Sequence, residues 1–202
     1  MIRKSMAILV VAASLTGCAH RVNLALTPSF DEAPKSESLA AIAPPLTMRT
    51  GDVADKRPDT TRISVFKQGI HTYNVYGERP LEDAIVDGLR SLFRQAGHTW
   101  VDGPDARVSV GVQILNIQTA RNAGFVKVGA TSSVQIRLDF IETRGGRTIH
   151  SEVYNGTDQR DQAMVGLMGM VKDSVDQAIV NCIASVGRDE KLAAALRAMA
   201  GS

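Results

Sequence analysis

The stretch 107-RVSVGVQI-114 decides the fold of this 202-residue chain. From residue 108 on, every second residue is apolar and the residues between are polar or glycine, and a second stretch, 134-VQIRLDF-140, repeats the pattern. Successive side chains of a strand point to opposite faces of a sheet, so a period of two predicts strands with one buried and one solvated face. Ile149 and Val153 continue the pattern and predict a third strand that buries these two residues.

The turn around the glycine pair at 145–146 leaves two pairings open for the last two strands. A two-residue turn would place Asp139 opposite Glu152, and like charges in that position destabilise a sheet. A four-residue loop over 143–146 instead places Asp139 opposite His150. Because it avoids the like-charge pair, we predict the four-residue loop.

Segments whose apolar residues have helical spacing precede and follow these strands in the sequence. This spacing predicts a helix over 81–96 that begins after Pro80 and ends before Gly97, a long helix over 165–186 and a last short helix over 189–199. Shorter strands are predicted at 45–50, 62–66, 71–76 and 100–101, with a polar loop over 51–58. Together these elements predict an α+β fold: an antiparallel β-sheet of about five to seven strands, with two long helices and a short C-terminal helix packed on one face.

The N-terminus contains a sorting signal. Two basic residues precede the apolar run 6-MAILVVAA-13, which has the length of a secretory signal and is too short for a membrane span. The run leads into 15-LTGC-18, the order of a lipobox, which implies cleavage before Cys18 and a diacylglycerol and an N-acyl chain on that cysteine. Two or more acyl chains hold a protein stably on a membrane.

These signals divide the chain into three parts. Residues 1–17 are a cleaved signal peptide, residues 18–45 are the lipidated N-terminus and a proline-containing tether, and residues 46–202 form a single α+β periplasmic domain. Residues 22–26 alternate weakly and could add an edge strand in place of part of the tether.

Charge and chemistry exclude several function classes. The chain has 23 Lys and Arg against 21 Asp and Glu, and two of the basic residues lie in the signal, so the mature chain has 21 of each and no electrostatic case for nucleic acid. No His, Cys, Asp or Glu pattern has the spacing of a metal or catalytic site. We therefore expect no catalytic, cofactor-binding or metal residues and no enzymatic activity, with the lipid on Cys18 as the only bound group. Cys182 lies on the apolar stripe of a predicted helix, which predicts a buried thiol.

One segment is rich in methionine. The run 164-MVGLMGM-170 contains three methionines and two glycines. Exposed Met164, Leu167 and Met170 would form a partner-binding surface. In the other interpretation, which we favour, the segment is core, and Gly166 and Gly169 let the helix lie close to the sheet.

The order of these elements resembles the YajG family of bacterial outer-membrane lipoproteins. The resemblance rests on the lipobox, on 55-DKR-57 after the first strand, and on the order and spacing of the helices and the sheet. It implies an α+β domain with helices on one face and brings no catalytic signature. Ala19 after the cysteine, by analogy with enterobacterial lipoproteins, implies the outer membrane and a domain that faces the periplasm.

These inferences lead to two expected functions. The first is an accessory or scaffolding component of a cell-envelope assembly, which would have the membrane and an envelope protein as its partners. The alternative is an auxiliary subunit of a lipid or lipopolysaccharide transport system, which would need an apolar groove.

Overall fold

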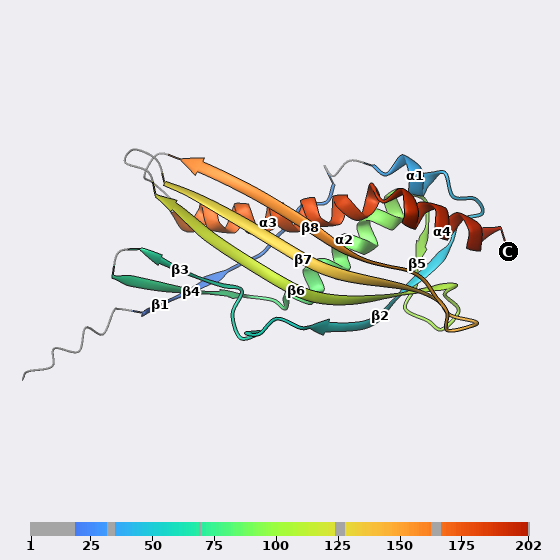
Figure 1. Cartoon of the computed structure of the whole chain (residues 1–202), viewed down its shortest axis with the longest axis horizontal. Helices are drawn as coiled ribbons and strands as arrows, with labels where there is room; N and C mark the ends of the chain where they lie inside the picture. The colour runs from blue at the N-terminus through green and yellow to red at the C-terminus, as the bar shows by residue number, and fades with distance from the viewer. Residues whose placement is uncertain (1–18, 32–34, 69, 124–127, 163–166, 202) are drawn as a thin grey trace, which may run out of the picture.

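The structure is a computed structural model, and it describes residues 19–31, 35–68, 70–123, 128–162 and 167–201 (Figure 1). A five-stranded sheet has the order β5-β2-β6-β7-β8, and a three-stranded sheet has the order β1-β4-β3. The strands are β1 (Ala19–Leu24), β2 (Thr47–Asp55), β3 (Ser64–Gln68), β4 (His71–Gly77), β5 (Thr99–Trp100), β6 (Val108–Ala123), β7 (Val128–Glu142) and β8 (Thr148–Gln162). The helices are α1 (Glu37–Ala40), α2 (Leu81–Gln95), α3 (Leu167–Gly187) and α4 (Glu190–Ala200).

The predicted α+β class is confirmed. The three longest strands, β6, β7 and β8, pair antiparallel and curve around α2 and α3, which pack on one face of the sheet (Figure 1). The topology differs from the prediction in two ways. Strand β2 pairs parallel with β5 and β6, and three of the first four strands, β1, β3 and β4, form a separate small sheet in which β1 is parallel to β4. Parallel partners that are far apart in sequence leave no local signal.

The alternating stretches of β6 and β7 form the core face as predicted. Their apolar members, from Val108 to Ile114 and from Val134 to Phe140, are at most 1% exposed. The stripe of α3 is buried as well, and Cys182 within it is 0% exposed. Burial raises the pKa of the Cys182 thiol to about 12, so this thiol is a neutral core group.

The β7–β8 hairpin has the predicted four-residue loop, but its register differs. Glu142 N donates to Arg147 O at 2.9 Å, which closes the loop over 143–146. One extra residue then enters β8 and shifts the register between Phe140 and Ile141. Asp139 therefore lies opposite Ser151 instead of the predicted His150. The like-charge pair with Glu152 is avoided, as expected.

This β-bulge decides which face of β8 meets the helices. A shift of one residue moves every following side chain to the other face of a sheet. His150 lies opposite buried Phe140, and Tyr154, opposite buried Ile136, belongs to the core. Val153, which was predicted to be buried, is only half-buried, while Ile149 is half-buried and still packs against the core. The prediction for Val153 was wrong because a bulge leaves no mark in the hydrophobic pattern.

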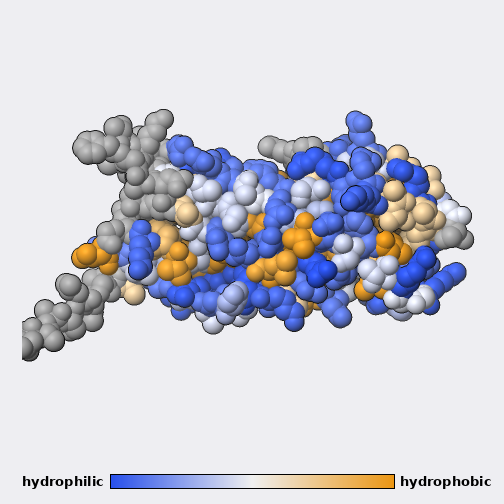
Figure 2. All heavy atoms as spheres, in the orientation of Figure 1, coloured by the Kyte–Doolittle hydropathy of each residue, from blue (hydrophilic) through white to orange (hydrophobic). Residues whose placement is uncertain are grey.

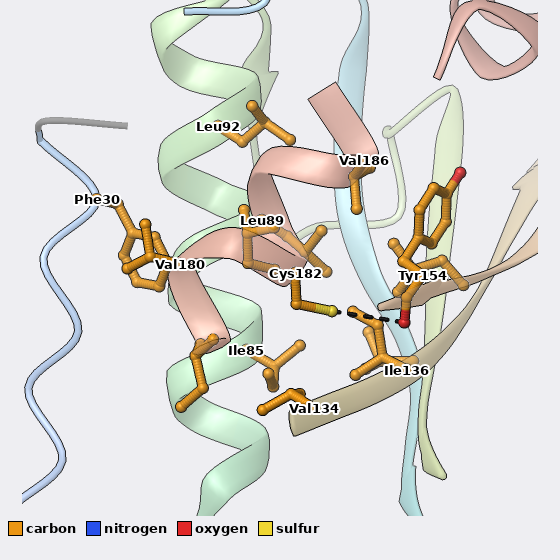
Figure 3. Packing of buried hydrophobic residues seen from close by; sticks show 14 of the residues in the cluster. Phe30, Ile85, Leu89, Leu92, Val134, Ile136, Tyr154, Val180, Cys182 and Val186 are labelled. Carbon is orange, nitrogen blue, oxygen red and sulfur yellow. Dashed lines mark hydrogen bonds between the residues drawn. The ribbon is translucent and has the colours of Figure 1, made fainter. Parts of the chain in front are cut away.

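The segment predicted to be a tether is packed against the domain. Strand β1 forms an edge of the small sheet, and it overlaps the edge strand that was the alternative prediction for residues 22–26. Five apolar residues of the segment belong to the core: Leu24, Leu26, Phe30, Leu39 and Ile42. The Phe30 ring lies beside Val180 of α3 and the α2 ribbon (Figure 3). A Cβ added to Gly88 of α2 would come within 2.6 Å of this ring. The folded domain thus includes described residues before residue 46, where the prediction placed its start.

A glycine does let α3 approach the sheet closely, but this glycine is a residue of strand β8 and not one of the predicted helix glycines. A Cβ on Gly156 of β8 would lie 2.1 Å from the Ala178 carbonyl oxygen and 2.3 Å from Cys182 N, both on α3. A Cβ on Gly169 would meet nothing within 4 Å, and Gly166 lies outside the described residues. The predicted close-approach role of Gly169 was therefore wrong.

Candidate functional site

Cys18, the predicted lipidation residue, lies outside the described residues, but its neighbour Ala19 is paired in a sheet. Ala19 is the first residue of β1 and pairs with Thr72 of β4. The cysteine that is predicted to carry the lipid is therefore bonded directly to a paired strand. In the part of the chain that the structure describes, no helix has the length and apolarity needed to cross a membrane.

The methionine segment is only partly described. Met164 lies outside the described residues, and Leu167 is the first residue of α3. Met170 is 6% exposed, so it does not contribute to an exposed surface. Met168 is half-buried and packs against the core. The burial of Met170 and Met168 favours the core interpretation for the described part of the segment.

The four histidines do not form one site: His20 Nε2 lies 2.9 Å from His71 Nδ1 on the small sheet, whereas His98 and His150 lie elsewhere. His98 is buried: its Nδ1 accepts from Leu46 N at 3.2 Å and its Nε2 donates to Leu39 O at 3.1 Å. Burial lowers the pKa of His98, which fits a neutral ring that ties α1 and the start of β2 to β5. Among the described residues no group of three or more His, Cys, Asp or Glu side chains could hold a metal ion.

One small polar cluster joins the sheet to α4. Asp189 Oδ2 accepts from Tyr154 Oη at 2.8 Å and lies 2.9 Å from His150 Nε2. Asp189 Oδ1 accepts from the backbone N–H of Lys191 and of Leu192, so this side chain is the N-cap of α4. Burial raises the pKa of Asp189, but the hydrogen bonds from Tyr154 and the two N–H groups outweigh it and hold the pKa below its usual value. Burial and the neighbouring carboxylate raise the pKa of Tyr154.

A hollow of about 640 Å³ lies where the small sheet meets the start of α2. Four arginines line it from three segments of the chain, together with three carboxylates: Arg21, Arg57, Arg62 and Arg79, with Asp55, Glu78 and Glu82. We call this feature the arginine hollow. Guanidinium groups offer five donors each in a planar fork that matches carboxylates and phosphates.

A buried ion pair shapes the wall of the arginine hollow. The Arg57 and Asp55 side chains are 6% and 9% exposed, and Arg57 Nη2 lies 2.5 Å from Asp55 Oδ2. Arg57 Nη1 also donates to the carbonyl oxygens of Arg62 and Ile63, at 2.9 and 3.3 Å. The pair thus pins the loop before β3. From the sequence alone, Asp55 and Arg57 were noted only as part of the resemblance to a family. The structure shows that they hold the loop before β3 in position.

The other three arginines are more exposed, although each has a partner: Arg62 Nε lies 2.5 Å from Asp59 Oδ2, and Arg62 Nη1 donates to Asn74 Oδ1 at 2.6 Å. Arg21 lies over the Tyr76 ring, 4.2 Å from its centroid, and Arg79 donates to Asp87 at 3.2 Å. The Arg62 and Arg79 side chains are 38% and 40% exposed, and Arg21 is exposed. Their donors can therefore reach a ligand or partner that enters the hollow. Sequence reasoning missed this site because these arginines are spread over residues 21–79 and only the tertiary structure brings them together.

Comparison with known proteins assigns the chain to a sequence family. The sequence model of a family described as "Uncharacterized lipoprotein" matches residues 50–197. No match was found among curated proteins.

Several solved structures are similar to this chain at low sequence identity. Protein XCC0632 from Xanthomonas campestris has a TM-score of 0.54 at 11% identity, over 83% of this chain and 92% of that one. Hypothetical protein CT253 from Chlamydia trachomatis has a TM-score of 0.44 at 10% identity, over 76% and 99%. Lipoprotein GNA1162 from Neisseria meningitidis has a TM-score of 0.37 at 13% identity, over 68% and 99%. The first of these supports the fold alone.

Proposed function

The chain belongs to the protein family described as "Uncharacterized lipoprotein", and from this premise we propose that it is a non-enzymatic lipoprotein of the cell outer membrane. In this proposal Cys18 carries the lipid, the domain faces the periplasm, and the protein is a binding or scaffolding component of a cell-envelope assembly. The finer placement in the YajG family is part of the same proposal.

The arginine hollow is the observation that supports a binding role. It is concave, and Arg21, Arg62 and Arg79 keep part of their guanidinium surface accessible. Arginine is enriched at the centres of protein interfaces because it combines several donors with a flat apolar face. An acidic segment of an envelope protein fits this chemistry. The neutral mature chain gives no comparable support to a nucleic acid partner.

The hydrogen bonds that Asp189 accepts support the non-enzymatic part of the proposal. A carboxylate that orients a catalytic base must hold that base toward a substrate. Asp189 does contact His150, at 2.9 Å, but both of its oxygens also accept structural hydrogen bonds, from Tyr154 and from the first turn of α4. The cluster that most resembles a catalytic arrangement thus has a structural task.

No observation favours the transport alternative over the binding role. A subunit that carries acyl chains needs a groove lined by apolar side chains. The arginine hollow is lined mainly by charged and polar residues. We therefore retain the binding role as the proposed function.

The anchoring part is tested by fractionation. Cys18→Ala should move the protein from the membrane fraction to the soluble periplasmic fraction, and the wild-type chain should sediment with outer-membrane markers in a density gradient. Retention of the variant in membranes would refute lipid anchoring on Cys18. Sedimentation of the wild type with inner-membrane markers would refute the outer-membrane placement alone.

The binding part is tested by photo-crosslinking in cells. A photoreactive residue at Thr60, an exposed position that lines the arginine hollow, should give a discrete adduct, and Arg79→Glu should weaken it. The same residue at exposed Gly145, in the β7–β8 turn, is the matched control. Adducts from position 164 without any from Thr60 would assign the interface to the methionine segment. Adducts of equal strength from Gly145, or none at any position, would refute the binding role.

A further inference from the structure

The small sheet of β1, β4 and β3 differs in chemistry from the rest of the chain. Its three strands contain no Asp or Glu, although the chain has 21. They do contain two cations, Arg21 and Lys67, and two of the three tyrosines of the chain, Tyr73 and Tyr76. Cations and aromatic rings without carboxylates are the composition found where proteins meet anionic lipid surfaces.

The β3–β4 hairpin exposes apolar surface at its tip. Ile70, in the turn, is 74% exposed, the highest value of any large hydrophobic residue that the structure describes. Val65, on β3 of the same hairpin, is 36% exposed, and Lys67 beside it is exposed. Figure 2 shows hydrophobic side chains at this end of the molecule. An exposed apolar tip flanked by a cation is suited to contact with a lipid surface.

The parallel pairing of β1 with β4 places this tip beside the anchor. Ala19 pairs with Thr72, only two residues after Ile70. Cys18 is bonded to Ala19, and consecutive Cα atoms are about 3.8 Å apart across a trans peptide bond. A strand rises about 3.3 Å per residue. Ile70 and Ala19, the residue after the predicted lipid attachment point, therefore lie at the same end of the sheet, within roughly 10 Å of each other. Figure 1 shows the start of β1 and the hairpin at the same end.

The aromatic face of the sheet makes this end rigid. Tyr73 stacks on Phe66 of β3 and on His20 of β1, with ring centroids 5.0 and 5.1 Å apart. Phe66 in turn is 5% exposed and belongs to the core. The hairpin tip is thus coupled to the domain, so contact of the tip with a surface would fix the orientation of the whole domain.

We infer that the small sheet is a membrane-contact module: the tip of the β3–β4 hairpin inserts Ile70 into the lipid surface to which Cys18 is anchored. Lys67 lies toward the headgroups, and the domain stands with its β7–β8 turn away from the membrane. This inference rests on the proposed lipid anchor, and it adds a second contact that restricts rotation about the anchor.

The test uses the full lipidated chain in vesicles of phosphatidylethanolamine and phosphatidylglycerol. Ile70→Cys can be labelled selectively with an environment-sensitive fluorophore, because Cys182 is 0% exposed and Cys18 would be acylated. Arg144→Cys, an exposed position in the β7–β8 turn at the opposite end of the molecule, is the matched control. Circular dichroism verifies that both variants fold.

The expected result is a blue-shifted emission from position 70 that brominated lipids quench at least twofold, with no shift or quenching at position 144. Flotation of the same samples reports the anchor separately. Protein that floats without quenching at position 70 would overturn the membrane-contact module and leave the anchor intact. Protein that does not float would overturn the anchor and the module with it. Equal quenching at both positions would overturn the proposed orientation.

Discussion

The contact between Gly156 and α3 gives a sharp prediction for stability. In Gly156→Ala the new Cβ would lie 2.1 Å from the Ala178 carbonyl oxygen, 2.3 Å from Cys182 N and 2.7 Å from Cys182 Cα. All three neighbours are backbone atoms, so no side-chain rotation relieves the overlap. The helix must therefore move away from the sheet by more than about 1 Å to reach ordinary van der Waals distance.

The cost follows from the packing that this movement disrupts. Val175, Ile179 and Cys182 of α3 are all 0% exposed in the core. A gap of 0.5–1 Å forfeits a quarter to a half of each contact energy, or about 1 kcal/mol for a side chain with a few dozen contacts. Gly156→Ala should thus lower the free energy of unfolding by about 3–4 kcal/mol, a large share of the roughly 5–15 kcal/mol typical of a domain.

Two other glycines serve as controls. In Gly111→Ala, on β6 of the same sheet, the new Cβ meets its nearest neighbour, Asp139 Cβ, at 3.6 Å. In Gly169→Ala, on α3, it meets nothing within 4 Å. We expect both variants to be unchanged or stabilised by up to about 1 kcal/mol, because alanine restricts the unfolded chain and favours a helix.

Urea unfolding of the unlipidated chain from Ala19 onward, followed by circular dichroism, measures all three variants. The midpoint for Gly156→Ala should fall by roughly 2 M at an unchanged slope. A loss below about 1 kcal/mol, or an equal loss in Gly111→Ala, would refute the close-approach reasoning.

Three further predictions concern residues outside this contact. Asp189→Ala should cost about 1–2 kcal/mol in urea unfolding, because it removes the N-cap of α4, and an effect no larger than that of exposed Glu190→Ala would contradict that role. The pKa of His98 is lower in the folded chain than its unfolded value of about 6.5. Below that pH the unfolded chain binds the proton more readily, so the free energy of unfolding decreases as the pH is lowered. The wild type should therefore lose more stability than His98→Asn between pH 8 and pH 5, and parallel losses would refute the buried neutral ring. Phe30→Ala should cost about 3–5 kcal/mol because the ring packs in the core, whereas a loose tether would give no change in the unfolding midpoint.

The sequence predicted those features that a short window of residues contains. The alternation from Val108 to Ile114 predicts a half-buried strand because side-chain direction has a period of two, and the stripe of α2 predicts an amphipathic helix for the analogous reason. The lipobox predicts the fate of Cys18 because a processing signal is a linear pattern.

Only the tertiary structure decided the features that depend on contacts between distant residues. The packing of Phe30, the bulge that turns His150 toward Asp189, and the approach of α3 to Gly156 each bring together residues more than 20 positions apart in the sequence. The arginine hollow likewise gathers side chains from β1, the loop before β3 and the start of α2. Burial and close approach are properties of pairs of segments, and a pattern read along one segment carries no information about its partner.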